Sequence, residues 1–408
     1  MVKRRLDDWI SSYLEYTEYS ESPISYHTWA AVSAVASALQ RKTHFQWADT
    51  TIYPNLYVIL VGPSGHARKG EPVNNIRGIL DDLGIKVVEE DITEEALIRE
   101  IKLSENFFDR NSKGSTFDKV AQSPVTICAE ELSVFCGQQN TRVLAYLTNW
   151  YDSRNKWGRR TKGSTVEEIA GICINMLAST APDWFPYIFT HEAVGGGFTS
   201  RCVFVVEERK RKSVSNPNLF PPRPGFKEDL MHDLEIISGM VGEYKFTPEA
   251  LEAYEKWYLE QDEIAMSGKL ILGEPVLQSY ESRRATLIKK ICMILCASYK
   301  NSYEVELEDF QRALALLTVT EEKMPAVFRG YGRSKYAEDT EAILSYIIRQ
   351  GPVRKSDLVK AFYRNVDDQA FESILSVLVQ MKTVGMKILT GDDDREYWYK
   401  GESTSEHN

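Results

Sequence analysis

The chain has 408 residues, of which 43% are hydrophobic and 26% are charged, a composition typical of a soluble globular protein with two or three domains. No apolar run reaches the length of a membrane span, and the first residues lack the apolar core of a signal peptide. The net charge of −10 argues against a protein coated with nucleic acid, although it permits a local basic track. The six cysteines have no paired spacing, which predicts free thiols, so we expect a cytoplasmic protein without a membrane partner.

The first part of the chain leads into a candidate phosphate-binding loop. Residues 1–48 are predicted to form an N-terminal helical segment, because apolar residues recur at helical spacing and an alanine-rich stretch follows them. Residues 56–61 form a short, nearly all-apolar run, which predicts a strand buried on both faces. A Gly-Pro-Ser-Gly turn, then Arg68 and Lys69, and then a predicted helix over residues 73–83 complete the stretch.

Strand, glycine turn, lysine and helix together predict a nucleotide site, in which backbone N–H groups and the helix N-terminus face an anion and Lys69 supplies a point charge. The predicted nucleotide contacts are Gly62, Pro63, Ser64, Gly65, His66, Ala67, Arg68, Lys69 and Gly70. Compared with the usual Gly-x-x-x-x-Gly-Lys-Ser/Thr spacing, the loop is one residue longer and ends in Gly70 instead of a hydroxyl residue. The alternative is a glycine turn between a strand and a helix, carrying two solvated cations.

A second short strand is predicted from residue 85, and a third over residues 124–129 ends in Glu130 and Glu131. Two adjacent carboxylates at the carboxyl end of an apolar strand suit metal-dependent hydrolysis, since one can hold Mg²⁺ and the other can polarise the attacking water. We assign Glu130 to the metal and Glu131 to the water, with roles that are exchangeable. The alternative is a strand that runs into two surface glutamates.

Residues 152–165 form the most cation-dense stretch of the predicted ATPase core. Its candidate nucleic-acid contacts are Arg154, Lys156, Trp157, Arg159, Arg160 and Lys162. Cations meet backbone phosphates and an aromatic ring stacks on bases, so a glycine-tipped hairpin of this kind suits a nucleic-acid backbone. The alternative is a solvated hairpin, which is the commoner explanation of a charge run.

Two further strands follow, each with a polar residue at one end. The strand over residues 169–178 leads into Ser179 and Thr180, which we assign as sensors of the γ-phosphate or the attacking water, with Asn175 as the other candidate. Arg201 directly precedes the fifth strand and is placed to complete a neighbouring subunit's nucleotide site. The alternative for Arg201 is a surface residue at a strand start.

The chain then leaves the core, predicted to span residues 49–226, through a charged and proline-rich segment. Residues 227–333 are predicted to form a helical lid, from which Arg283 or Arg284 could reach the phosphates. The alternative for either residue is a cation on the surface of a helix. We take Arg284 as the candidate nucleotide contact.

Residues 334–402 contain three predicted helices and a β-hairpin, the order of a winged helix, and residues 403–408 are expected to be a disordered tail. The third helix is acidic, which suits a protein partner or DNA contact through the wing and Arg354, Lys355, Lys360 and Arg364.

These motifs together resemble the AAA+ replication ATPases of phages and mobile elements, which are akin to the minichromosome-maintenance and superfamily-3 helicases. The resemblance covers residues 1 to about 400. The segments that carry it are residues 62–65 with 68–70, 129–131, 159–162, 178–182 and 197–201. The resemblance implies an α/β fold: a P-loop AAA+ core with N-terminal helices, a helical lid and a C-terminal winged helix.

The family also implies roles for particular residues. Its basic segment before the sensor strand is a hairpin that projects into the central channel of a ring and pulls DNA, a role that the resemblance gives to residues 154–162. Its Ser-Arg pair before the last strand is the arginine finger, here Arg201. Two departures concern the metal: Gly70 removes the usual hydroxyl ligand, for which Ser64 is the substitute candidate, and Glu130 stands where aspartate is usual.

The function that the resemblance implies is a ring-forming ATPase, expected to be a hexamer. It would use ATP and Mg²⁺ to move along single-stranded or forked DNA during replication of a phage or mobile element, together with replication proteins. Two alternatives stay open: a helicase loader or assembly ATPase, and a DNA- or protein-binding scaffold that does not hydrolyse ATP.

Overall fold

The computed structural model describes residues 3–110, 119–137, 140–159, 167–189, 197–328, 337–362, 368–389 and 394–400. The chain divides into two compact units, Met1–Phe328 and Arg329–Asn408. None of the helices within the described ranges combines the length and apolarity that a bilayer crossing requires.

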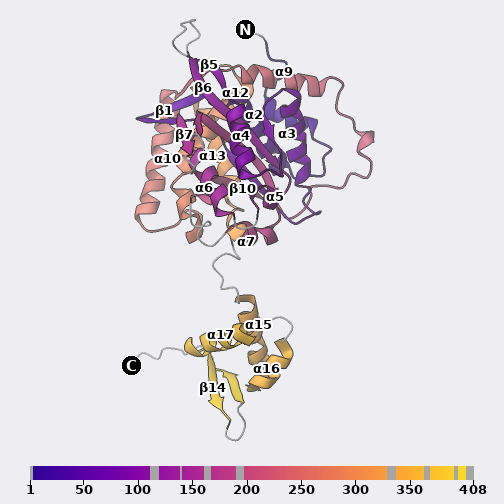
Figure 1. The fold of residues 1–408 in the computed structure, drawn as a ribbon, viewed down its shortest axis with the longest axis vertical. Coiled ribbons are helices and arrows are strands. Elements are labelled where there is room, and N and C mark those ends of the chain that lie inside the picture. The colour runs from indigo at the N-terminus through magenta and orange to yellow at the C-terminus, as the bar shows by residue number, and fades with distance from the viewer. Residues whose placement is uncertain are drawn as a thin grey trace. The chain divides into compact units, whose positions relative to one another are not determined.

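A mostly parallel sheet runs through the first unit, with helices around it (Figure 1). Its strands follow the order β10-β3-β9-β6-β4 with all neighbours parallel, and β5 pairs antiparallel with β6. The strands are β3 (Tyr57–Val61), β4 (Val87–Val88), β5 (Asn106–Asp109), β6 (Lys119–Ala129), β9 (Ile172–Thr180) and β10 (Cys202–Val206). The predicted α/β class is therefore confirmed, and the sheet is compatible with a P-loop-like core.

The strand predicted over residues 169–178 is wrong at its beginning. Gly171 has a φ of 57°, in the left-handed region that favours glycine, and it divides the run into two strands. The first, β8 (Glu167–Ala170), pairs with β7 (Lys156–Arg159) in a separate two-stranded hairpin, and β9 begins only after the glycine.

Helices cover the sheet because its strands are apolar on both faces; every residue of β3 and β9 is buried. The α-helices among the described residues of this unit are α1 (Trp9–Tyr16), α2 (Ile24–Leu39), α3 (Gly70–Asp82), α4 (Glu94–Leu103), α5 (Leu132–Cys136), α6 (Thr141–Trp150), α7 (Phe185–Ile188), α9 (Phe226–Ser238), α10 (Pro248–Met266), α11 (Gln278–Glu281), α12 (Arg284–Tyr299), α13 (Leu307–Glu321) and α14 (Pro325–Phe328). Short 3₁₀ turns are η1 (Pro182–Trp184), η2 (Thr199–Arg201), η3 (Pro217–Leu219) and η4 (Pro275–Leu277). Residues 29–39 of α2 are all buried, since this helix of small and apolar residues packs against β3, β9, α3, α9 and α12.

A second, smaller sheet joins two segments that the sequence predicts to be helical. Its strands are β1 (Thr43–Trp47), β2 (Thr50–Ile52), β11 (Gly242–Phe246) and β12 (Glu304–Val305), in the order β12-β11-β1-β2. The helical predictions for residues 1–48 and 227–333 are therefore wrong at β1, β11 and β12. In β1 the buried Thr43 and Phe45 alternate with a less buried residue, the two-residue period of a strand, and Thr43 pairs with Gly242 from far along the chain.

Lys290 ties α12 to the beginning of β3. Its ammonium donates to both the main-chain and the side-chain oxygen of Asn55, each at 2.8 Å, and lies 4.3 Å from the ring centre of Tyr151. Burial lowers the pKa of Lys290 to about 7, because an apolar interior disfavours the charged form.

The second unit contains three helices and a three-stranded antiparallel sheet. Its elements are α15 (Ala337–Gln350), β13 (Val353–Arg354), α16 (Lys355–Phe362), α17 (Asp368–Gln380), β14 (Val384–Ile388) and β15 (Arg395–Tyr399). The core includes Ile343, Ile347, Phe371, Ile374 and Tyr397. The helices and the hairpin lie where the sequence predicts them, β13 was missed, and the winged-helix class stays a prediction. The tail over residues 403–408 lies outside the described residues.

We expect Lys290→Met to change the pH dependence of stability. Its folded pKa of about 7 is below the ordinary value of 10.5, so between these values the unfolded chain binds a proton that the folded chain does not. The free energy of unfolding of the wild type should therefore rise with pH relative to Lys290→Met, by about 1 kcal/mol per pH unit. Urea unfolding at about pH 7 and about pH 9 measures the difference. Parallel pH profiles for the two proteins would contradict the burial of an ionisable lysine.

Candidate functional site

The carboxyl ends of three parallel strands meet at one edge of the large sheet. Val61, the last residue of β3, pairs with Thr180, the last residue of β9. Ala129, the last residue of β6, pairs with Ala178 of β9. Ligands of open α/β sheets bind outside the carboxyl ends of the strands. The glycine loop, the two glutamates and the candidate sensors, which are far apart in the sequence, are thus brought to the same edge.

The glycine loop leads from β3 directly into α3. Gly62 lies so close to the carbonyl of Glu207 and the hydroxyl of Tyr26 that a Cβ would collide with both. The loop then turns through two left-handed residues, Gly65 with φ 75° and Arg68 with φ 52°, before α3 begins at Gly70. The loop thus places the N-terminus of α3, a helix of 13 residues, against the pocket, where it favours an anion.

Lys69 is the buried cation of this loop. It is only 8% exposed, and within the described ranges its ammonium has neither a hydrogen bond nor an ion pair. Burial lowers the pKa of Lys69, while the negative charge of Glu131 opposes that shift. Because Lys69 lines the pocket and its ammonium has no partner among the described residues, this position favours binding of an anionic group.

The two glutamates are held differently. The main chain of both is fixed by Glu90, whose carboxylate accepts from the N–H of Glu130 at 3.2 Å and of Glu131 at 2.7 Å. Ser179 donates its hydroxyl to the carbonyl oxygen of Glu130 at 2.5 Å. Thr180 donates to the carboxylate of Glu131 at 3.3 Å. The two sensor candidates thus contact the two glutamates, one through the main chain and one through the side chain.

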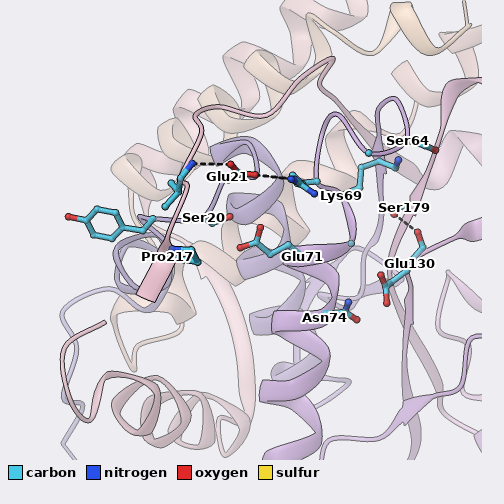
Figure 2. Close-up of a pocket in the computed structure, with 14 residues that line it drawn as sticks. Ser20, Glu21, Ser64, Lys69, Glu71, Asn74, Glu130, Ser179 and Pro217 are labelled. Atoms are coloured by element: carbon cyan, nitrogen blue, oxygen red, sulfur yellow. Dashed lines mark hydrogen bonds and ion pairs between the residues drawn. The ribbon is translucent and has the colours of Figure 1, made fainter. Parts of the chain in front are cut away.

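The pocket at this edge has a volume of about 570 Å³, within the range of small-molecule sites. Figure 2 shows Ser64, Ser179 and Glu130 on one side of it and Ser20, Glu21 and Pro217 on the other, with Lys69, Glu71 and Asn74 between them. The remaining lining residues are Tyr19, Gly65, Arg68, Gly70 and Val214. The pocket therefore combines the phosphate-loop residues with a wall from the N-terminal segment and from the segment after β10.

Glu21 joins these three parts of the chain and was missed by sequence reasoning. Its carboxylate pairs with Arg68 at 3.1 Å and with Lys210 at 2.7 Å, and it accepts from the N–H of Val214 at 2.9 Å. The hydrogen bond from Lys210, with the N–H of Val214, lowers the pKa of Glu21 to about 2. Glu21 is far from the loop in sequence, so no local pattern points to it; Glu90 follows strand β4 and could have been found from the strand-end rule.

The residues present fit a magnesium ion held together with a phosphate. The described part of the chain contains no group of three or more His, Cys, Asp or Glu side chains that could hold a metal alone. Mg²⁺ is usually held by one or two carboxylates plus substrate phosphates rather than by an all-protein cage. The carboxylate of Glu130 lies directly over Gly70, and Ser64 is an exposed residue of the same pocket.

Three of the predicted site residues lie away from this pocket or serve the fold. Arg201 is at the start of β10, the opposite edge of the sheet, where its guanidinium donates to Asp152 at 3.1 Å and to the Gly197 carbonyl at 2.7 Å. The buried guanidinium of Arg284 donates two hydrogen bonds to the carboxylate of Glu321, each 2.8 Å long. Asn175 is buried and accepts from the N–H of Leu56, so this sensor alternative has a structural role.

The basic hairpin is formed by β7 and β8, but much of its predicted binding face is engaged within the protein. Trp157 packs edge-on against Trp150, 5.5 Å between ring centres, and against Tyr146 at 5.7 Å. Arg159 pairs with Glu94 at 2.7 Å. Arg154 and Lys156 are exposed, whereas Arg160 and Lys162 lie outside the described residues.

The cations predicted on the second unit are also partly paired. Lys355 pairs with Glu372 of α17, and Lys360 pairs with Asp357 at 3.3 Å. Arg354 is exposed, and Arg364 lies outside the described residues.

Comparison with known proteins adds no assignment to this geometry, since no protein-family model matches the chain and a search of curated proteins finds no match.

We expect Trp157→Ala to lower the free energy of unfolding by about 2 kcal/mol, because the ring loses its packing against Trp150 and Tyr146. Chemical denaturation measures the change, and Arg154→Ala on the exposed side of the same hairpin is the control, expected within about 0.5 kcal/mol of the wild type. A Trp157→Ala protein as stable as the wild type would mean that the ring is available to a ligand instead.

Proposed function

We propose that the protein is a P-loop ATPase of the AAA+ class. The observation that carries the proposal is the meeting of Lys69 and Glu130 in one pocket, with Glu131 next to Glu130 and close enough to Lys69 to oppose the lowering of its pKa by burial, although the lysine and the glutamates follow different strands. An unpaired buried cation at the start of a helix favours a phosphate, and two carboxylates beside it supply what hydrolysis needs. A plain glycine turn with two solvated cations is disfavoured by the burial of Lys69.

Each residue has a defined part in this proposal. The N–H groups of the glycine loop and the ammonium of Lys69 hold the phosphates of ATP. Glu130, at the pocket wall, would hold Mg²⁺, which when bound neutralises charge on the phosphates. Glu131 would orient the attacking water and accept its proton, and its carboxylate is held for this role by Thr180 and by Ser133, each at 3.3 Å.

The proposal extends to a ring, expected to be a hexamer, that moves along DNA in phage or mobile-element replication. In this proposal Arg201 would serve the nucleotide of a neighbouring subunit, since it precedes β10, at the end of the sheet away from the pocket of its own chain; its side chain is only 8% exposed in the single chain. To act there the guanidinium would exchange Asp152 for a phosphate. The second unit, with the element order of a winged helix, would bind DNA or a replication protein.

A second candidate is a helicase loader or assembly ATPase, which uses the same pocket but does not pull DNA. The internal packing of Trp157 and the Arg159–Glu94 ion pair favour it, because both remove side chains from the face that a translocating hairpin needs. The non-hydrolysing scaffold is the remaining alternative.

We expect the purified protein to hydrolyse ATP and single-stranded DNA to stimulate the turnover. Lys69→Ala should abolish nucleotide binding, whereas Glu131→Gln should retain binding and lose at least about 100-fold in turnover, since only the water-orienting group is removed. Phosphate release and nucleotide binding, measured in parallel, distinguish the two losses. A wild type that binds nucleotide without turnover would favour the scaffold, and a wild type that does not bind it would overturn the proposal.

The two DNA-related functions differ in their dependence on the hairpin. We expect Arg154→Glu with Lys156→Glu to remove most of the DNA stimulation of a translocase, because reversing two exposed cations weakens phosphate contacts and flattens their salt dependence. Basal turnover, measured without DNA, should stay at the wild-type level because neither residue lines the pocket. DNA stimulation that persists in this double variant would instead favour the loader.

A further inference from the structure

Gly70 and Glu130 are the two departures from the usual P-loop pattern that concern the metal, and they are in contact. A Cβ built on Gly70 would lie 2.5 Å from the carboxylate oxygen Oε2 of Glu130, 3.5 Å from its Cδ and 3.8 Å from its Cγ. The three nearest atoms all belong to this one side chain. The carboxylate arm of Glu130 therefore occupies the space that a side chain at position 70 would fill.

The backbone does not explain the glycine. Gly70 is the first residue of α3 and is not among the residues with a positive φ, so a serine or alanine could adopt its conformation without strain. Gly78 in the same helix offers a contrast, because a Cβ there would meet nothing within 4 Å. The side chain of Glu130, to which the three nearest atoms belong, is therefore what requires a glycine at position 70.

We propose that Gly70 and Glu130 form a compensating pair, in which the glutamate carboxylate takes the place of the missing loop hydroxyl toward Mg²⁺. This inference rests on the proposed function. P-loop NTPases hold Mg²⁺ through a loop Ser or Thr and through an aspartate that follows a strand. Here the hydroxyl side chain is absent, and the acidic side chain is longer by one methylene and extends into the vacated volume.

The main chain of Glu130 is held from two directions, which makes the length of its side chain decisive. Ser179 donates to its carbonyl oxygen at 2.5 Å, and Glu90 accepts from its N–H at 3.2 Å. An aspartate on the same main chain would end about 1.5 Å short of the glutamate carboxylate, one C–C bond. A serine at position 70 would displace the glutamate carboxylate, but it would fit beside an aspartate and bring its own hydroxyl. Ser64 is then not required as the metal ligand.

The test is a set of exchanges in the full-length chain, read out as binding of a fluorescent ADP analogue (N-methylanthraniloyl-ADP) with and without Mg²⁺. We expect Gly70→Ser and Glu130→Asp each to lose about tenfold of the Mg²⁺-dependent part of the affinity. The double variant Gly70→Ser/Glu130→Asp should recover to within about threefold of the wild type, because hydroxyl and aspartate together restore the usual ligand pair. Gly70→Ala/Glu130→Asp, which has the space-filling methyl but no hydroxyl, should stay as weak as Glu130→Asp.

A control variant separates folding from metal binding. Gly78→Ser should bind like the wild type with and without Mg²⁺, because a Cβ at position 78 meets nothing within 4 Å and the residue does not line the pocket. A double variant no better than the weaker single variant would overturn the compensation while leaving the ATPase proposal in place. A wild type that binds the analogue neither with nor without Mg²⁺ would overturn both the inference and the proposed function, and so the two failures are distinguishable.

Discussion

The whole candidate site depends on β9 pairing in parallel with β3 on one side and with β6 on the other. This pairing places the glycine loop after β3 and the glutamates after β6 on either side of Ser179 and Thr180, whose hydroxyls donate to the main chain of Glu130 and the carboxylate of Glu131. Since every residue of β9 is buried, a shift in its register would disrupt the packing on both faces of the strand and would also separate these contacts. The register of β9 therefore determines both the stability of the sheet and the geometry of the pocket.

Around this edge the charges are arranged unevenly. Lys69 is buried without an ionic partner among the described residues, whereas Arg68, next to it, is paired with Glu21. A phosphate in the pocket would give Lys69 a partner and would compete with Glu21 for Arg68. Because Glu21 also pairs with Lys210, that competition would reach the N-terminal segment and the segment after β10. Nucleotide binding is thus expected to alter contacts outside the loop itself.

The sequence predicted the parts of the fold that depend on local pattern. Apolar runs that end in a glycine or in charged residues identified β3, β6 and β10, and the order of the phosphate-loop and paired-carboxylate motifs predicted that Lys69 and Glu131 share a site. Pairing between distant segments leaves no pattern in the local sequence. For this reason the sequence predicts a helix where β1 lies, although Thr43 pairs with Gly242. The same holds for Arg284, whose type suggested a ligand contact but whose partner, Glu321, is distant in the sequence. Trp157 in β7 packs on the nearby Trp150 at the end of α6, and the residue type alone did not reveal this contact.

The most direct test of the account is hydrogen exchange of the full-length protein, followed by mass spectrometry, with and without a slowly hydrolysed ATP analogue and Mg²⁺. The account predicts slower exchange in the segments over residues 62–71, 130–131 and 179–180, which surround the pocket, and unchanged exchange at the start of β10 in a single chain. Exchange that is unaffected in residues 62–71, or slowed only at another surface of the protein, would contradict the placement of a nucleotide at this edge of the sheet.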